Sequence, residues 1–330
     1  MYATSASQRE GVAAYCITGG RPRLKDRPTK QILDSLASEG IATAWVLSDR
    51  DADVYERDEH EMIVYPRTWA LDYATAHWLL PTPPEAGTFL GAFPGREYAC
   101  VTGETRGYRG VLQLDDNIRA LSIGRGGKAA YGLAREHGPV AFLDLLAAVT
   151  YSTNARMVGA QLEAVNQIKP VFARPGFPYS FFIEQLGKGR EHWNGPYEDD
   201  ITHALQYGRR ADGATAALLP ILRYNKESKS KTGMRSHYDH TRSVQLQRCF
   251  PEAAKITIRR GRANGRGEAR VFHQMQARAI QNRLRVTDPD LYRRAGETLT
   301  WILSTYDERR ERWVKQKVAG HVAKHGHTPR

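Results

Sequence analysis

Cysteine is scarce in this chain of 330 residues, and long apolar runs are missing. The three cysteines, Cys16, Cys100 and Cys249, lie far apart and do not have the spacing of a metal site. We expect buried thiols in a reducing compartment. No stretch reaches about 18 apolar residues, so we expect no membrane span. The first ten residues lack the apolar segment of a secretory signal, which favours a cytoplasmic protein.

Charge is plentiful but unevenly placed. The chain carries a net charge of +12, from 48 Lys and Arg against 36 Asp and Glu. Residues 255–330 hold 18 of the basic and 7 of the acidic residues, so the first 254 residues are almost neutral. A basic C-terminal quarter indicates a polyanionic partner such as DNA. A solvated helical surface would give the same composition, so this alternative stays open.

Apolar runs alternate with helical patterns in the first part of the chain. The runs 12–18 and 41–47 are typical of buried strands, and residues 28–40 between them are typical of a helix. This order predicts an α/β fold with a mostly parallel sheet flanked by helices. The composition changes after residue 254. We therefore expect one domain over residues 1–254 and a basic, mainly helical region over 255–330, with helices near 272–284 and 288–318.

Polar residues follow the first two predicted strands. Ligands of parallel sheets bind where the strands end, at their carboxyl edge. The segment after the first strand contains Thr18, Gly19, Gly20 and Arg21, and Asp49 follows the second strand. We expect these residues to line a binding site.

An apolar run ends in carboxylates at Asp115, Asp116 and Asn117. Two carboxylates and an amide suit a hard cation such as Mn²⁺ or Mg²⁺, which prefers oxygen ligands. A cation there would neutralise the charge that builds on a departing diphosphate. The alternative is a turn that only caps the following segment.

A second acidic cluster, Glu198, Asp199 and Asp200, follows Trp193 after a short turn. A carboxylate at this place could take a proton from an attacking hydroxyl, and Trp193 could form a wall for a sugar ring. Acids at a helix start also interact favourably with its dipole, so a capping role is the alternative.

A polar loop predicted over Lys226 to His240 contains further candidates. His237 could complete a cation site, and Lys231 could hold phosphate oxygens. Histidines and lysines are also common on surfaces, and the sequence leaves that alternative open.

The order of these motifs resembles the TET-associated glycosyltransferases, which are GT-A-type enzymes that occur in bacteriophages. The resemblance spans residues 12–238 and rests on four segments: Leu114 to Ile118, Tyr179-Ser180, Trp193 to Asp199, and Lys231-Thr232-Gly233 with Tyr238. It does not cover the basic C-terminal region.

The resemblance implies a GT-A-like catalytic domain over residues 1–254. It implies a UDP-sugar donor, Mn²⁺ or Mg²⁺, and transfer to hydroxymethylated cytosine in DNA, in the cytoplasm of a bacterium or a phage-infected host. Asp115 to Asn117 match the cation and donor motif, and Glu198 and Asp199 match an acidic pair whose aspartate is the base. Thr18 to Arg21 and Asp49 fall where such enzymes hold the nucleotide. A nucleotidyltransferase and a non-catalytic nucleic-acid-binding protein are the alternatives. The sequence does not indicate the oligomeric state.

Overall fold

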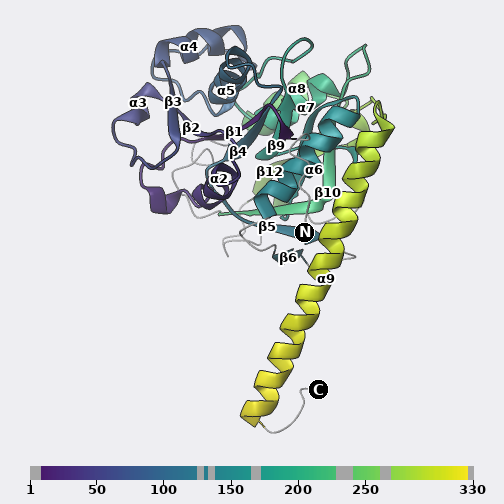
Figure 1. The fold of residues 1–330 in the computed structure, drawn as a ribbon. Helices are drawn as coiled ribbons and strands as arrows, with labels where there is room; N and C mark the ends of the chain where they lie inside the picture. The colour runs from purple at the N-terminus through teal and green to yellow at the C-terminus, as the bar shows by residue number, and fades with distance from the viewer. Residues whose placement is uncertain are drawn as a thin grey trace.

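The computed structural model describes residues 9–124, 130–132, 138–164, 172–227, 241–260 and 269–325. A ten-stranded sheet forms its centre, with the strand order β3-β2-β1-β4-β9-β7-β10-β5-β6 and β8 beside β10 (Figure 1). The strands of this sheet are β1 (Val12–Ile17), β2 (Thr43–Ser48), β3 (Glu61–Tyr65), β4 (Gly110–Asp115), β5 (Ile118–Gly124), β6 (Ala130–Gly132), β7 (Ala155–Leu162), β8 (Arg174–Pro175), β9 (Phe181–Gln185) and β10 (Thr215–Lys226). The helices are α2 (Lys30–Ala37), α3 (Asp49–Ala52), α4 (Arg67–Ala76), α5 (Phe93–Thr105), α6 (Gly138–Ser152), α7 (Asp199–Tyr207), α8 (Thr241–Cys249) and α9 (Pro289–His325).

The sheet is mixed but mostly runs in one direction. Strands β3, β2, β1 and β4 pair in parallel, as do β7 and β10. Strand β9 lies antiparallel between β4 and β7, and β5 and β8 are antiparallel to β10. The predicted α/β class with a mostly parallel sheet is therefore confirmed.

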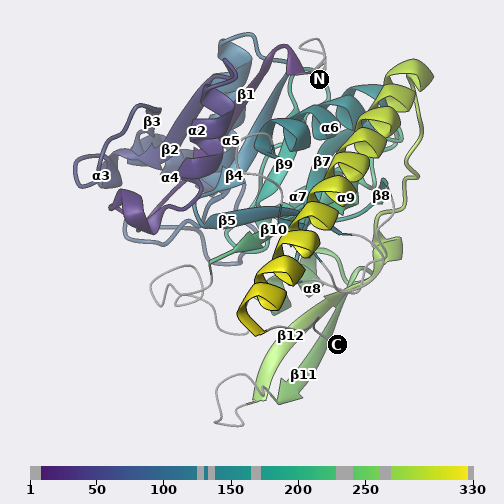
Figure 2. The same cartoon turned by 60° about the horizontal axis from the view of Figure 1, so that its bottom comes forward.

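Helices cover both faces of the sheet because its strands are apolar on both sides. In β1, for example, Ala14 and Cys16 belong to one buried cluster, and Ala13 and Tyr15 belong to the other. Side chains of α2, α6 and the start of α9 are buried in the first cluster, and those of α4, α5 and α7 in the second. Figure 2 shows α6 and α9 running across the sheet. Such two-sided burial is typical of parallel sheets. It leaves the edges of the sheet, where strands end, to carry a site.

The C-terminal region is not helical throughout. Strands β11 (Ala254–Arg260) and β12 (Ala269–Met275) form an antiparallel hairpin, so the helix predicted near 272–284 is wrong. Residues 272–275 belong to β12, and Ala277–Ala279 form one short 3₁₀ turn. Backbone pairing with β11 outweighs any helical preference of this segment, and Asn264-Gly265 between the two runs is a hairpin signal that we overlooked. The predicted helix near 288–318 is confirmed as the longer α9.

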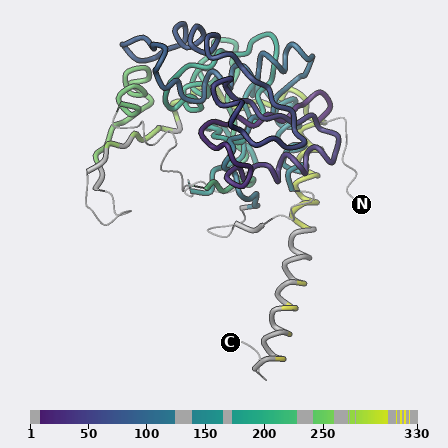
Figure 3. The backbone as a smooth tube through the Cα atoms, turned by 90° about the vertical axis from the view of Figure 1, so that its left-hand side faces the viewer, coloured from purple at the N-terminus to yellow at the C-terminus, as the bar shows by residue number. Residues whose placement is uncertain are grey.

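The hairpin and α9 leave the body at separate places (Figure 3). Ala295, Leu299 and Ile302 of α9 are buried in the same cluster as α6, and the helix then continues well past the sheet in Figure 1. The division at residue 254 stays a prediction. Within the described ranges, no helix is long and apolar enough to cross a membrane.

Candidate active site at the carboxyl edge of the sheet

The two predicted acidic clusters lie at the same edge of the sheet. Strand β4 ends at Asp115, and α7 begins at Asp199. Arg96, in the first turn of α5, joins them. Its Nη2 donates to Asp115 Oδ1 at 2.9 Å, and its Nε donates to Asp199 Oδ2 at 3.0 Å. One guanidinium thus holds the end of a strand and the start of a helix that are far apart in sequence.

Arg96 is buried, with 3% of its surface exposed. Its guanidinium carbon lies 5.2 Å from the ring centre of Trp193 and 5.4 Å from that of Phe182, so two aromatic faces support the charge. Trp193 itself is fully buried and stacks on His203 at 3.9 Å. The prediction that Trp193 forms a wall for a sugar ring is therefore wrong for this conformation. Its ring fills the core behind Arg96 and has no open face.

Gly195 explains how the second cluster reaches α5. A Cβ atom at this position would lie 2.1 Å from the ring of Phe93, the first residue of α5. Only a glycine lets the turn approach the helix so closely. This contact brings the turn that leads into Asp199 against the helix that carries Arg96.

Asp115 is fully engaged by cationic groups. Besides Arg96, Lys226 donates from Nζ to Asp115 Oδ2 at 2.5 Å and to Ser180 Oγ at 2.6 Å. Burial raises the pKa of Asp115, but Lys226 and Arg96 outweigh it and hold the pKa well below its usual range. Asp115 is therefore ionised and fixed in place. Lys226, which we expected in a loop, is the last residue of β10.

Asp116 points to the end of β1. Thr18 donates from Oγ1 to Asp116 Oδ2 at 2.8 Å, and Arg21 donates from Nη1 to Asp116 Oδ1 at 2.7 Å. The Tyr55 hydroxyl accepts the backbone N–H of Arg21 at 2.9 Å and orders the loop. Burial raises the pKa of Asp116 to about 6, although Arg21 and Thr18 oppose the shift. Neighbouring cationic groups thus compensate the negative charge of Asp116 less well than that of Asp115.

The donor set at Asp116 and Asn117 fits a hard cation. Asn117 Oδ1 is buried and has no hydrogen-bond partner among the described residues, whereas Asn117 Nδ2 donates to the Glu227 carbonyl at 3.1 Å. A buried acceptor without a donor is costly unless something else satisfies it. An amide oxygen beside a weakly compensated carboxylate suits Mn²⁺ or Mg²⁺, and Arg21 would have to release Asp116 Oδ1.

The three acids at the start of α7 repel one another. Burial raises the pKa of Glu198, Asp199 and Asp200, and the neighbouring carboxylates raise them further. Arg96 lowers the pKa of Asp199 but does not cancel the shift. A carboxylate with a raised pKa is a stronger base than a free aspartate, which suits proton abstraction.

The remaining predicted residues have different surroundings. Gly19 and Gly20 are exposed in the loop beside Thr18, and Gly20 has a φ of 72°. Asp49 is exposed and accepts the Arg67 backbone N–H at 3.0 Å, so in this conformation it caps α4. Lys231 and His237 lie outside the described residues. Their predicted roles, like those of Gly19, Gly20 and Asp49, stay predictions.

Arg96, Ser180 and Tyr55 were not identified from the sequence as members of this site. Pro94 at the start of α5 is a helix-start signal that would have placed Arg96 in a first turn. Ser180 entered only as part of the Tyr179-Ser180 segment of the resemblance and was given no role, and no local motif marks Tyr55, because both residues reach the site through tertiary contacts.

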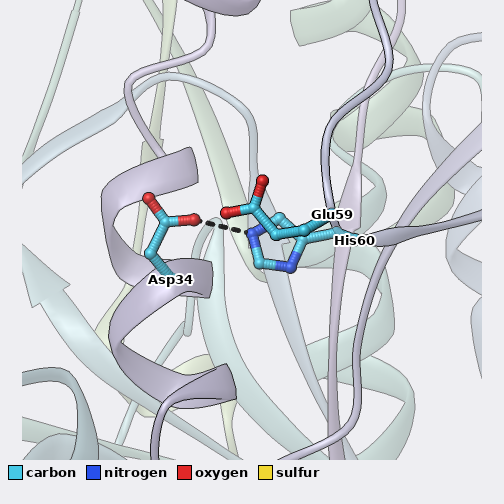
Figure 4. Close-up of side chains that lie close together, drawn as sticks. All are labelled: Asp34, Glu59 and His60. Atoms are coloured by element: carbon cyan, nitrogen blue, oxygen red, sulfur yellow. Dashed lines mark hydrogen bonds and ion pairs between the residues drawn. The ribbon is translucent and has the colours of Figure 1, made fainter.

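A second group of potential metal ligands lies elsewhere. The ligand atoms of Asp34, Glu59 and His60 all lie within 4.8 Å of one another (Figure 4). This group is beside the amino ends of β2 and β3, since His60 Nδ1 lies 2.8 Å from the Thr43 hydroxyl. Lys30 donates from Nζ to Asp34 at 2.7 Å and to Glu59 at 2.8 Å. An ammonium group already occupies the position that a cation would take, so this group is an ion-pair network.

Comparison with known proteins gives no family assignment. No family model matches this chain, and no curated protein matches it. Among solved structures, glucosyl-3-phosphoglycerate synthase from Mycobacterium tuberculosis, in complex with Mn²⁺, UDP and phosphoglyceric acid, is 9% identical, with a TM-score of 0.45, and the match covers 82% of this chain and 88% of that chain. A mycobacterial protein is 10% identical, with a TM-score of 0.44 and coverage of 82% and 85%. Mannose-1-phosphate geranyltransferase from Thermus thermophilus is 13% identical, with a TM-score of 0.29 and coverage of 64% and 58%. At these values the similarities carry no argument about the chemistry of this site.

Proposed function

We propose that this chain is a cation-dependent glycosyltransferase. It takes a sugar from a nucleotide diphosphate donor, with UDP as the expected nucleotide, and transfers it to a hydroxyl group of the acceptor. The observation that carries the proposal is the convergence of Asp115 and Asp199 on Arg96 at the edge where the strands end. This arrangement supports a GT-A-like enzyme, as the resemblance of the sequence motifs implies.

The reaction needs a base and a stabilised leaving group. We assign Asp199 as the base that takes the proton of the acceptor hydroxyl, whose oxygen then attacks the anomeric carbon. The bond from that carbon to the diphosphate oxygen breaks, and the nucleotide diphosphate leaves with the electron pair. A base on the opposite side of the sugar from the leaving group gives inversion of the anomeric centre. We assign Glu198, which directly precedes Asp199, the role of holding Asp199 in position.

A bound Mn²⁺ or Mg²⁺ would supply charge stabilisation for the departing diphosphate. Asp116 and Asn117 would hold it, with His237 as a further proposed ligand. Asp115 stays fixed between Arg96 and Lys226, so we assign it to the donor rather than to the metal. Thr18 and Arg21, with Gly19, Gly20, Asp49 and Lys231 as further candidates, would hold the nucleotide.

We propose 5-hydroxymethylcytosine in DNA as the acceptor. The hydroxymethyl group of this base is a primary alcohol that a carboxylate can activate. The negative charge of the DNA phosphate backbone is complementary to the positive charge of residues 255–330. The β11–β12 hairpin supports this choice because its described strands project from the body (Figure 2) and carry basic residues such as Arg259, Arg260 and Arg270.

A mass-spectrometric transfer assay tests the proposal. The protein is incubated with a panel of nucleotide sugars, Mn²⁺, and DNA with or without hydroxymethylcytosine. We expect a hexose-sized mass gain on the modified DNA alone, and its loss with EDTA. Release of pyrophosphate with a nucleotide left on the acceptor would instead identify a nucleotidyltransferase. DNA binding with no affinity for any nucleotide sugar would identify a non-catalytic binding protein.

A further inference from the structure

Glu198 has a backbone conformation that needs support. Its φ of 50° and ψ of 38° lie in the left-handed region, and it directly precedes Asp199. This region is unfavourable for a residue other than glycine. The conformation makes Glu198 the cap of α7, since its carbonyl accepts the Thr202 backbone N–H at 2.9 Å. Whatever holds Glu198 therefore fixes the direction in which α7 and Asp199 begin.

The support comes from the C-terminal part of the chain. Arg242 of α8 donates from Nη1 to Glu198 Oε1 at 3.2 Å, and His273 Nε2 of β12 lies 3.8 Å from Glu198 Oε2. Gln245 of α8 donates from Nε2 to the Tyr197 carbonyl at 2.8 Å. Tyr197 and Glu198, which directly precede Asp199, are thus both held by α8, a helix outside the central sheet.

These supporting residues belong to one unit. His273 Nδ1 lies 3.2 Å from the Ser243 hydroxyl, which ties β12 to α8. Leu246 of α8 and Ala254 at the start of β11 are buried in the same cluster as Ile201 of α7. We call α8 with strands β11 and β12, the described residues 241–260 and 269–275, the arm. It is anchored at the turn before Asp199, and the hairpin extends from there away from the body (Figure 3).

We infer that the arm positions the proposed base: Arg242 is a positioning residue that holds Glu198 and thereby aims Asp199. The inference takes its substrate from the proposed function, whereas the positioning role stands on the contacts alone. The proposed donor residues Asp115 and Asp116 are held by other elements, since Arg96 lies on α5, Lys226 ends β10, and Thr18 and Arg21 follow β1. We therefore expect a change in the arm to affect the base and to leave donor binding unchanged.

The test compares Arg242→Gln with Arg242→Lys and with Arg248→Gln. Arg248 is exposed on the same helix, so its replacement removes the same charge without touching Glu198. We expect Arg242→Gln to lower kcat for transfer roughly 10- to 100-fold, because small displacements of catalytic groups have effects of this size. The Kd for UDP with Mn²⁺ should stay unchanged, Arg242→Lys should recover part of kcat, and Arg248→Gln should match the wild type.

Hydrogen exchange supplies a readout that does not need turnover. Arg242→Gln should speed amide exchange at the start of α7 while the strands of the sheet stay protected. Unchanged exchange there, or unchanged kcat in Arg242→Gln, would overturn the inference while leaving the proposed function intact. A wild-type protein that binds no nucleotide sugar would refute the proposed function, and the exchange experiment would still decide the positioning role.

Discussion

Asp115 and Asp199 share a single buried guanidinium, that of Arg96. Asp115 ends a central strand, and Asp199 begins a helix on the second face of the sheet. The rings of Trp193 and Phe182 pack against Arg96, which pairs with both carboxylates at once. The donor-side acid and the proposed base therefore form one electrostatic unit, and a change at Arg96 must affect both.

Replacing Arg96 should change the pH dependence of catalysis. Burial raises the pKa of Asp199 and Arg96 lowers it, so Arg96→Met should raise that pKa further. A base must be ionised to act, so the acid limb of kcat should move to higher pH, and kcat should fall roughly 100-fold. Profiles of kcat against pH check this. Arg106→Met, just past the other end of α5, is the control and should leave the limb in place. An Arg96→Met profile identical to the wild type would contradict the assignment.

Replacing Asp116 should remove cation binding. Asp116→Asn keeps the shape but loses the charge, so the affinity for Mn²⁺ should fall at least about tenfold by calorimetry. The pKa of Asp116 is about 6, so protons should compete with the cation as the pH drops below 6, and wild-type affinity should fall there. Asp34→Asn tests the other ligand group and should not change Mn²⁺ affinity. If Asp34→Asn lowered the affinity for Mn²⁺ and Asp116→Asn did not, the cation site would lie at Asp34, Glu59 and His60, near the amino ends of β2 and β3.

Glu97 should make stability depend on pH. Burial raises its pKa, but the Arg190 guanidinium, His192 and the Trp193 N–H outweigh burial and lower the pKa from 4.5 to about 2. A lowered pKa stabilises the folded state above pH 4.5, and this contribution is lost as pH falls towards 2. Glu97→Gln should therefore cost at most about 3 kcal/mol at pH 7 and little near pH 2.

Urea unfolding at several pH values measures this difference. Glu104→Gln is the matched control, because Glu104 also contacts Arg190 but is 32% exposed on its side chain. We expect a clearly smaller loss for the control. An equal loss of unfolding free energy in the two variants would contradict the prediction, because the buried Glu97–Arg190 pair would then stabilise the fold no more than the exposed contact of Glu104.

Trp193 distinguishes a core role from a sugar-binding role. Its Nε1 donates to the buried Glu184 Oε2 at 2.9 Å, and Trp193→Phe leaves that carboxylate short of a donor. We expect a loss of about 1–3 kcal/mol in the free energy of unfolding, with no change in the KM of the donor. Trp301→Phe, at a partly exposed position on α9, should be neutral. If Trp193→Phe instead raised the KM of the donor and left stability unchanged, Trp193 would contact the sugar of the donor, as the sequence predicted.

Much of the sheet and one half of the site could be predicted from local sequence. The apolar run that ends at Asp115 indicates β4, and the acids from Glu198 to Asp200 indicate the start of α7, because each element has a strong start or stop signal. Strand direction was harder. The β9 strand is antiparallel between two strands of the opposite direction, and no local pattern encodes the partner of a strand.

The contacts that join the clusters could not be predicted in the same way. Arg96, Lys226 and Arg242 reach the carboxylates from three different elements, and only the tertiary fold brings them there. Trp193 was misjudged because an aromatic residue beside a turn has the same local sequence whether it faces solvent or the core. Part of strand β12 was misjudged as the start of a helix because its pairing partner, β11, lies on the other side of a glycine-rich stretch.

The variant Asp199→Asn tests the account most directly. Its transfer of sugar to hydroxymethylcytosine DNA and its Kd for the UDP-sugar with Mn²⁺ should be measured beside those of the wild type. We predict that donor binding is retained while transfer falls at least about 100-fold, because only the proton acceptor is removed. Transfer at the wild-type rate by Asp199→Asn would contradict the assignment of the base and, with it, the shared site around Arg96.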